Sequence, residues 1–151
     1  MISKTDKLII TELRNNARMA LADISRNTGI PVSTIFDKLK KLEERCVHKH
    51  TSLIDFSKVN YNMIVNFVLR VEEKEREKVR SFLLKHNNIN NVFRLNSGYD
   101  FLVEGVFRDM KQIEDFNEEI MKFKIVSKKD FHVIEELKKE EFLSEKEHFD
   151  L

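Results

Sequence analysis

The sequence contains very little cysteine, proline and glycine: one, one and three residues among 151. The single cysteine, Cys46, cannot form an internal disulfide, so we expect the chain to work in a reducing compartment. No stretch approaches the roughly 18 apolar residues of a membrane-spanning helix, and the first residues lack the apolar core of a signal peptide. We therefore expect a cytoplasmic protein that makes no membrane contact.

The chain also lacks an excess of charge, because 27 Lys+Arg face 26 Asp+Glu and the formal net charge is +1. This balance excludes a generally basic, polyanion-binding protein. The charge is unevenly distributed, however. Residues 1–50 hold 10 basic and 6 acidic residues, a net of +4, whereas residues 51–151 hold 17 and 20, a net of −3. The positive excess near the start fits local contact with nucleic acid.

The stretch GIPVSTIFDKLKKLEE, residues 29–44, predicts a turn followed by an amphipathic helix. Gly29 accepts the left-handed backbone of a tight turn, and Pro31 suits the first turn of a helix. The apolar residues recur at the spacing i, i+4, i+7, and the opposite face carries hydroxyl and charged groups. These sets are Ile35, Leu39 and Leu42, and Ser33, Thr34, Asp37, Lys38 and Lys41. Because such a polar face reaches base edges and phosphates, we interpret it as a recognition helix.

Two further helices are predicted before it, over residues 4–16 and 20–28. Ser3 and Asp6 are typical of a capped helix start. Two short helices joined by a glycine turn, after a supporting helix, form a helix-turn-helix. Residues 47–53 then favour an extended wing strand. The sequence therefore predicts a winged helix-turn-helix domain over residues 1–53, followed by a linker over 54–62.

The remaining pattern predicts an α+β domain over residues 63–137. Strict alternation of apolar residues indicates a strand over 63–71. The predicted order is β-α-β-β-α-β, which is the ferredoxin-like arrangement. The other elements are helices at 74–86 and 109–122, with Met110, Ile113, Phe116 and Ile120 facing inward, and strands at 91–96, 101–107 and 130–136. Residues 138–151 read as an acidic tail that is either an added helix or partly ordered.

Three segments together carry a resemblance to a known family. They are TDKLIITELRNNAR (5–18), GIPVSTIFDKLKKLEE (29–44) and SGYDFLVEGV (97–106). A three-helix DNA reader followed by a βαββαβ domain, with a Gly-Tyr-Asp hairpin, resembles the Lrp/AsnC family of feast/famine transcription regulators. The resemblance implies a homodimer that binds double-stranded DNA, often assembles into tetramers or octamers, and commonly responds to an amino-acid effector.

Carried onto this sequence, the resemblance implies two sets of site residues. The DNA-facing set is Ser33, Thr34, Phe36, Asp37, Lys38 and Lys41, with Lys49 and Arg18 on phosphates. The effector-side set is Gly98, Tyr99 and Asp100. Family members usually have a basic residue where Phe36 stands and often where Asp37 stands. Phe36 can contact a thymine methyl, and Asp37 can either accept from cytosine or pair with Lys41 along the helix.

Several alternatives remain at this point. Cys46, His48 and His50 alternate as metal ligands on a strand would, but three ligands in five residues rarely close a tetrahedral site, and we expect a polar surface without metal. Gly98 and Asp100 are also ordinary turn residues. Siroheme decarboxylases have the same two-domain layout, but the comparable stretch here has only Arg94 and no histidine. We therefore expect a protein without catalytic residues or cofactor. A ligand-sensing protein that has lost DNA binding is a further alternative.

Overall fold

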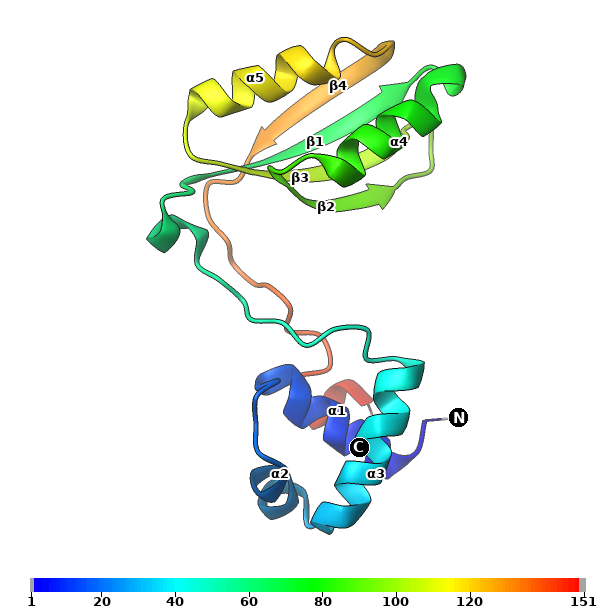
Figure 1. Ribbon diagram of the computed structural model, residues 1–151, viewed down its shortest axis with the longest axis vertical. Coiled ribbons are helices and arrows are strands. Elements are labelled where there is room, and N and C mark those ends of the chain that lie inside the picture. The colour runs from blue at the N-terminus through cyan, green and yellow to red at the C-terminus, as the bar shows by residue number, and fades with distance from the viewer. Residues whose placement is uncertain (1, 150–151) are drawn as a thin grey trace. The chain divides into compact units, whose positions relative to one another are not determined.

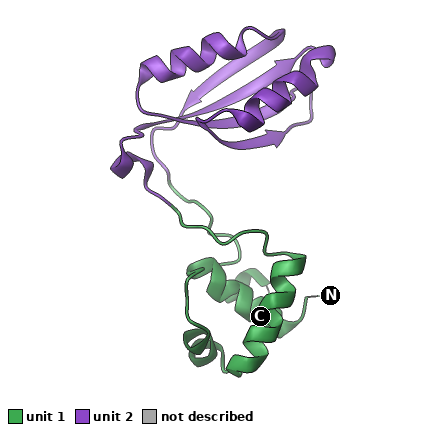
Figure 2. Cartoon of the chain, viewed as in Figure 1, with its two compact units in different colours: residues 1–53, 137–151 green, residues 54–136 purple. Residues whose placement is uncertain are grey.

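The chain is organised as two compact units, shown in different colours in Figure 2. The computed structural model describes residues 2–149. The helical unit contains the described residues up to Leu53 together with those from Leu137 onward, and the sheet unit spans Ile54–Glu136. The acidic tail is thus part of the helical unit, although it follows the sheet unit in sequence.

The helical unit is built from three helices around a small apolar core. They are α1 (Lys4–Asn15), α2 (Leu21–Thr28) and α3 (Val32–Arg45). Ser3 and Asp6 form the predicted capping box at the start of α1. Gly29 ends α2 with a φ of 73°, a left-handed conformation that glycine adopts without strain. The core consists of Ile9, Ile24, Ile30, Ile35 and Leu42.

The predicted wing strand is not formed. Residues 47–53 have no strand hydrogen bonds anywhere in the described part of the chain. A strand is stabilised by pairing with a neighbour, and this segment has no strand beside it to pair with. A short 3₁₀ helix, Phe56–Val59, follows in the predicted linker.

The sheet unit has the ferredoxin-like fold that the sequence predicted. Its four strands lie in the order β2-β3-β1-β4, and all neighbouring strands are antiparallel. Both helices cover one face of the sheet (Figure 1). The elements are β1 (Met63–Val71), α4 (Arg76–Lys85), β2 (Ile89–Arg94), β3 (Phe101–Phe107), α5 (Met110–Ile120) and β4 (Ile125–His132), with short 3₁₀ helices at Glu73–Glu75 and, in the tail, Lys146–Phe149.

The core of this unit lies between the sheet and its two helices. Phe67 on β1 contacts the rings of Phe107 and Phe116, at centroid distances of 6.2 and 4.8 Å. Gly105 makes room for this cluster, because a Cβ there would lie 2.4 Å from the Phe107 ring. The alternation predicted for β1 and β3 is confirmed, since their inward residues are the buried ones.

Two sequence predictions about this unit were wrong in detail. Strand β4 begins at Ile125 rather than near residue 130. The prediction missed its first half because this edge strand carries Lys128 and Asp130 on the face toward the helices, where they form an ion pair of 2.5 Å. Met110 is half exposed at the start of α5 instead of facing inward. No helix within residues 2–149 is long and apolar enough to cross a membrane.

Candidate DNA-binding surface and ligand cavity

The outer face of α3 presents polar and aromatic side chains to solvent. Burial of Ile35 and Leu42 fixes the orientation of the helix. Ser33, Asp37 and Lys41 are exposed in consequence. Lys40 also lies on this face, one turn beyond Phe36, and the sequence-derived site omitted it.

Two further positions complete this face. Phe36 leaves 60% of its surface accessible, and Thr34 lies at the flank, half-buried. No ion pair joins Asp37 to Lys41 within the described chain, so the intrahelical alternative for Asp37 is not realised. The Phe36 ring is therefore accessible to a binding partner.

Lys38 differs from the other residues of the predicted DNA-facing set. Its Nζ lies 2.7 Å from Oδ1 of Asp6 and 3.2 Å from Oγ of Ser3, so its ammonium is engaged with the start of α1. The ion pair is partly buried, with side-chain exposures of 29% and 12%. In this structure Lys38 therefore holds α3 against α1.

Asp6 is held in its charged form by these contacts. Burial by itself would raise the pKa of this carboxyl group, but hydrogen bonds from Lys38 and Ser3 and the lysine charge outweigh it. The pKa of Asp6 is lowered from 3.8 to about 2. The carboxylate is therefore charged at all pH values above the acid range, and it stabilises the α1–α3 contact there.

The two predicted phosphate contacts outside α3 are accessible. Arg18 is exposed in the α1–α2 connection, where its backbone N–H donates to Oδ1 of Asn16 at 3.0 Å. Lys49 is exposed in the extended segment after α3. His50, in the same segment, lies 2.9 Å from a carboxylate oxygen of Glu43. The side chains of Arg18 and Lys49 are thus both available to a polyanion.

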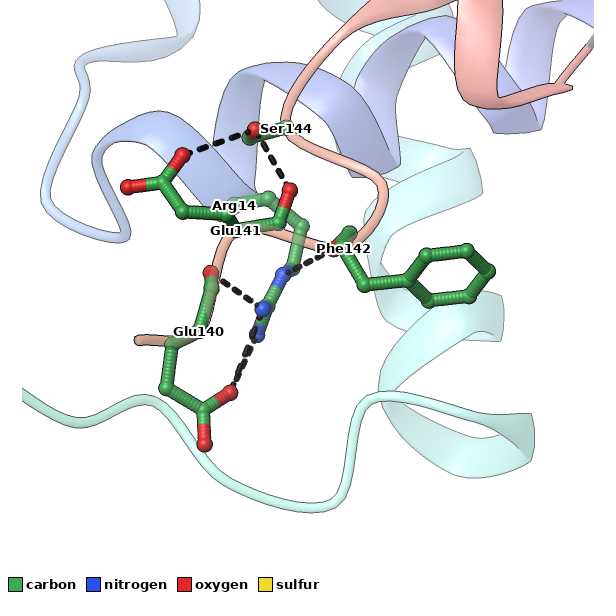
Figure 3. A network of polar contacts seen from close by, with 5 residues as sticks. All are labelled: Arg14, Glu140, Glu141, Phe142 and Ser144. Atoms are coloured by element: carbon green, nitrogen blue, oxygen red, sulfur yellow. Dashed lines mark hydrogen bonds and ion pairs between the residues drawn. The ribbon is translucent and has the colours of Figure 1, made fainter. Parts of the chain in front are cut away.

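The acidic tail docks on α1 through backbone contacts, as Figure 3 shows. Arg14 donates to the carbonyl oxygens of Glu140 and Phe142, at 2.5 and 2.9 Å, and also contacts the Glu140 carboxylate at 3.2 Å. Nδ2 of Asn15 donates to the carbonyl oxygen of Ser144 at 2.7 Å. Ser144 is only 8% exposed as a result. These contacts make the tail a fixed part of the helical unit.

A second cation of α1 also contacts the tail. Lys7 Nζ donates to the Phe149 carbonyl oxygen at 3.3 Å and lies 5.5 Å from the centre of the Phe149 ring. Glu140 and Leu143 both have positive φ, 54° and 66°. Residues other than glycine hold such a conformation only where surrounding contacts impose it. The polar contacts of the tail with α1 leave no pattern in the sequence that would have predicted them.

The sheet unit contains a cavity of about 350 Å³ beside the turn between β2 and β3. Its walls come from the end of β1, the start of α4 and residues 96–99. Ser97 and Gly98 both have positive φ, and the N–H of Tyr99 donates to the carbonyl oxygen of Asn96, which closes a tight hairpin turn. All three residues of the predicted effector-side set, Gly98, Tyr99 and Asp100, line this cavity.

Asp100 is the most connected residue of the cavity wall. It is 5% exposed, and its Oδ2 accepts the N–H of Val71 at 2.7 Å. Its Oδ1 accepts from Arg76 Nε and Arg94 Nη1, both at 2.8 Å. Burial would raise the pKa of this carboxyl group, but these three donors lower it below its ordinary value. Asp100 therefore holds the cavity together as a charged group.

The face of the sheet opposite α4 and α5 carries apolar side chains near the surface. Val68 of β1 lies directly beside Leu102 of β3, and Leu102 lies beside Phe93 of β2. Phe93 and Phe131 each leave 55% of their surface accessible. Polar groups share this face, since Phe131 lies beside Asn66 and Asn66 lies beside Glu104.

Two models of known protein families match this chain, one in the helix-turn-helix and one in the sheet unit and part of the tail. Residues 2–45 match a model described as winged helix-turn-helix DNA-binding, and residues 64–142 match the Lrp/AsnC ligand binding domain. The second match alone spans more than half of the chain. The chain belongs to the Lrp/AsnC family. The family resemblance seen in the sequence is thereby confirmed.

Named relatives of this Lrp/AsnC protein are transcriptional regulators. An uncharacterized HTH-type transcriptional regulator of Pyrococcus abyssi is 25% identical, over 94% of this chain and 97% of the relative. The HTH-type transcriptional regulator FL11 of Pyrococcus horikoshii is 29% identical, over 76% and 77%.

Solved structures support the same fold. The transcriptional regulator NMB0573 of Neisseria meningitidis, solved as a complex with L-Met, has a TM-score of 0.85 at 21% identity and covers 92% of this chain and 94% of its own. LrpC of B. subtilis has a TM-score of 0.84 at 16% identity, over 91% and 98%.

The low pKa of Asp6 makes the stability of this Lrp/AsnC protein depend on pH in a defined window. Because its folded pKa lies below the ordinary value, its contribution is complete above about pH 4 and is lost as the pH falls toward about 2. We expect Asp6→Asn to lower the free energy of unfolding by about 1–2 kcal/mol at neutral pH, and this difference to shrink across that window. Urea unfolding at several pH values measures it, with Asp37→Asn as the exposed control. A difference that stays constant between pH 5 and pH 3 would contradict this account.

Docking of the tail depends on the guanidinium of Arg14. We expect Arg14→Gln to raise the hydrogen–deuterium exchange rate of the Ser144 amide several-fold, because about 1 kcal/mol of hydrogen bonding to the tail is lost. Arg26→Gln, which removes an exposed ion pair on α2, is the matched control. Equal exchange in Arg14→Gln and the unaltered protein would show that the tail is held by other contacts.

Proposed function

We propose that this Lrp/AsnC regulator is a sequence-specific DNA-binding protein that reads the major groove with α3. The supporting observation is the exposed outer face of α3 in a helix-turn-helix whose inner face is fully used in packing. Ser33, Thr34 and Phe36 lie near the start of the helix, the part that a recognition helix directs at base edges. Asp37 follows them and can accept from a cytosine amino group.

Cationic groups around α3 supply the phosphate contacts in this proposal. Lys40 and Lys41 are exposed in the second half of the helix, and Arg18 and Lys49 flank it in sequence. Such contacts position the reader and add affinity without sequence preference. Lys38 has a different role here, because its ion pair with Asp6 holds α3 against the start of α1.

The proposed unit of function is a homodimer formed through the open face of the sheet. Val68, Leu102, Phe93 and Phe131 supply the apolar centre of that interface. A dimer presents two recognition helices, which suits a pseudo-palindromic site with half-sites about 34–36 Å apart. Assembly of dimers into tetramers or octamers is an extension of this proposal, and the cytoplasm is the expected location.

The cavity beside the β2–β3 turn is the proposed effector site. It lies in the segment matched by the Lrp/AsnC ligand binding domain, and it has the size of a small-molecule site. Gly98 and Tyr99 line it directly, and Asp100 shapes it. An amino-acid-like effector would act by binding one assembly state of the regulator more tightly than another.

Substitutions on α3 separate affinity from sequence preference. We expect Lys41→Ala to weaken operator and unrelated DNA about equally and to reduce the slope of log affinity against log salt by about 1 per recognition helix. Ser33→Ala and Thr34→Ala should instead reduce the difference in binding affinity between operator and unrelated DNA. Fluorescence anisotropy at several salt concentrations measures both, after genomic selection has identified the operator. Lys122→Ala, an exposed lysine of the sheet unit, is the control.

Those measurements also decide the proposal. Equal binding of all DNA fragments by the unaltered protein would overturn sequence-specific recognition. An effect of Lys122→Ala as large as that of Lys41→Ala would show that the DNA surface lies elsewhere.

The dimer proposal is tested by a charge placed on the open sheet face. We expect Leu102→Glu to convert the dimer to a monomer at micromolar concentration, because a carboxylate would be buried without a partner. Light scattering after size-exclusion chromatography measures the mass. Leu84→Glu alters a leucine that is 61% exposed on α4, on the covered side of the sheet, and should leave the mass unchanged. The same mass for Leu102→Glu and the unaltered protein would exclude this interface.

A further inference from the structure

The cavity beside the β2–β3 turn is unusually rich in arginine. Arg70, Arg76 and Arg94 line it, against the carboxylates of Glu73 and Asp100. Asp100 is already engaged, because its two oxygens accept from the Val71 N–H, Arg76 and Arg94, which fill three of its roughly four acceptor positions. The cavity therefore offers an excess of cationic donors to whatever it binds.

Most of the guanidinium N–H groups in the cavity donate no hydrogen bond to a residue between 2 and 149. Arg76 bonds to Asp100 through Nε alone, so both of its terminal nitrogens remain available. Arg94 uses only Nη1, for the carboxylate and the carbonyl oxygen of Asp100. Arg70 makes no hydrogen bond or ion pair with any residue between 2 and 149. Arginine presents several donors in a planar fork, which matches the two oxygens of a carboxylate.

The turn adds neutral donors at the same wall. The backbone N–H groups of Ser97 and Gly98 donate to no carbonyl oxygen of the described chain. The Ser97 hydroxyl makes only a long contact of 3.4 Å with the neighbouring Asn96 side chain. Backbone N–H groups in a left-handed turn are suited to an anion. Glu73 is the one carboxylate of the lining that is left to accept from a ligand ammonium group.

We propose that this cavity binds a small dicarboxylate, with the arginine forks and the turn N–H groups holding its two carboxylate ends. The proposal rests on the proposed effector role of the cavity and names the chemical class of the effector. The volume of about 350 Å³ lies at the lower end of small-molecule sites and suits a molecule of amino-acid size. Acidic amino acids and diacids without an ammonium group share this chemistry.

Other amino-acid classes match the lining poorly. A basic side chain would meet three guanidinium groups and a single available carboxylate, so its charge would be repelled. An aliphatic side chain would gain little, because Val71 and the Tyr99 ring are the main apolar groups of the lining. NMB0573, which has a similar fold, was solved with L-Met, an amino acid with an uncharged side chain, so methionine is a necessary comparison ligand.

Calorimetry with the full-length protein tests the ligand class. The probes are glutamate and aspartate, which carry an ammonium group, and 2-oxoglutarate and succinate, which do not. Methionine, leucine and lysine are the comparison ligands, all at one ionic strength. We expect at least one dicarboxylate to bind tenfold or more tightly than every comparison ligand. Preference for the first pair would assign an ammonium contact to Glu73, and equal binding of both pairs would assign recognition to the carboxylates alone.

Arg70→Gln is the decisive variant, because Arg70 is exposed and its loss removes no internal contact. We expect it to weaken dicarboxylate binding at least tenfold. Arg80→Gln, which removes an exposed arginine of α4 outside the cavity, should bind as the unaltered protein does. Tighter binding of methionine, leucine or lysine, no binding of any dicarboxylate, or unchanged binding by Arg70→Gln would each overturn the proposal.

Anisotropy with operator DNA keeps this proposal distinguishable from the DNA-binding proposal. A dicarboxylate that binds in calorimetry while the protein shows no operator preference would support the ligand class and reject sequence-specific regulation. Operator binding that responds to a comparison ligand and not to a dicarboxylate would keep effector control and reject the ligand class.

Discussion

The buried carboxylate of Asp100 joins three separate parts of the sheet unit. It receives the backbone N–H of Val71 at the end of β1, Arg76 at the start of α4 and Arg94 at the end of β2. Its own N–H donates to Leu69, so the backbone is connected at the same point. A buried charge is tolerated only with such complete pairing, since an unpaired one costs several kcal/mol. These contacts fix the wall of the cavity beside the β2–β3 turn.

In the helical unit a similar constraint acts on α3. A helix that buries one face and binds DNA with the other must have its rotation fixed before it meets DNA. Ile35 and Leu42 fix it by burial, and the Lys38–Asp6 ion pair fixes it from the side. In both units an aspartate with a lowered pKa therefore holds neighbouring elements in place: Asp6 joins α1 to α3, and Asp100 joins β1, α4 and β2.

Local patterns in the sequence predicted most of the fold, but not the contacts between distant segments. Period-3.6 and period-2 spacing identified the three helices of the reader and strands β1 and β3, because each has one fully buried face. Strand β4 was misplaced because an edge strand carries charged residues on its inward face. The prediction of a wing strand at 47–53 was wrong because a local pattern that favours extended backbone does not show whether a second strand lies beside it.

The candidate sites were predictable to the same extent. The hairpin residues 98–100 were identified from the sequence and do line one cavity, yet Arg70 and Arg76, which give that cavity its charge, come from other elements and were missed. Lys38 was assigned to DNA because its position at the flank of the helix is close to the polar face. Its partner Asp6 lies 32 positions away, and only the tertiary structure brings the two together.

The return of the chain to α1 has a practical consequence. The polypeptide leaves the helical unit after Leu53 and re-enters it at Leu137, so the tail belongs to the same unit as α1. Arg14 and Asn15 anchor the returning segment to α1, so this segment is held by the helical unit. A label or fusion attached at the carboxyl end would accordingly report on the DNA-reading half of the molecule, not on the half that carries the cavity.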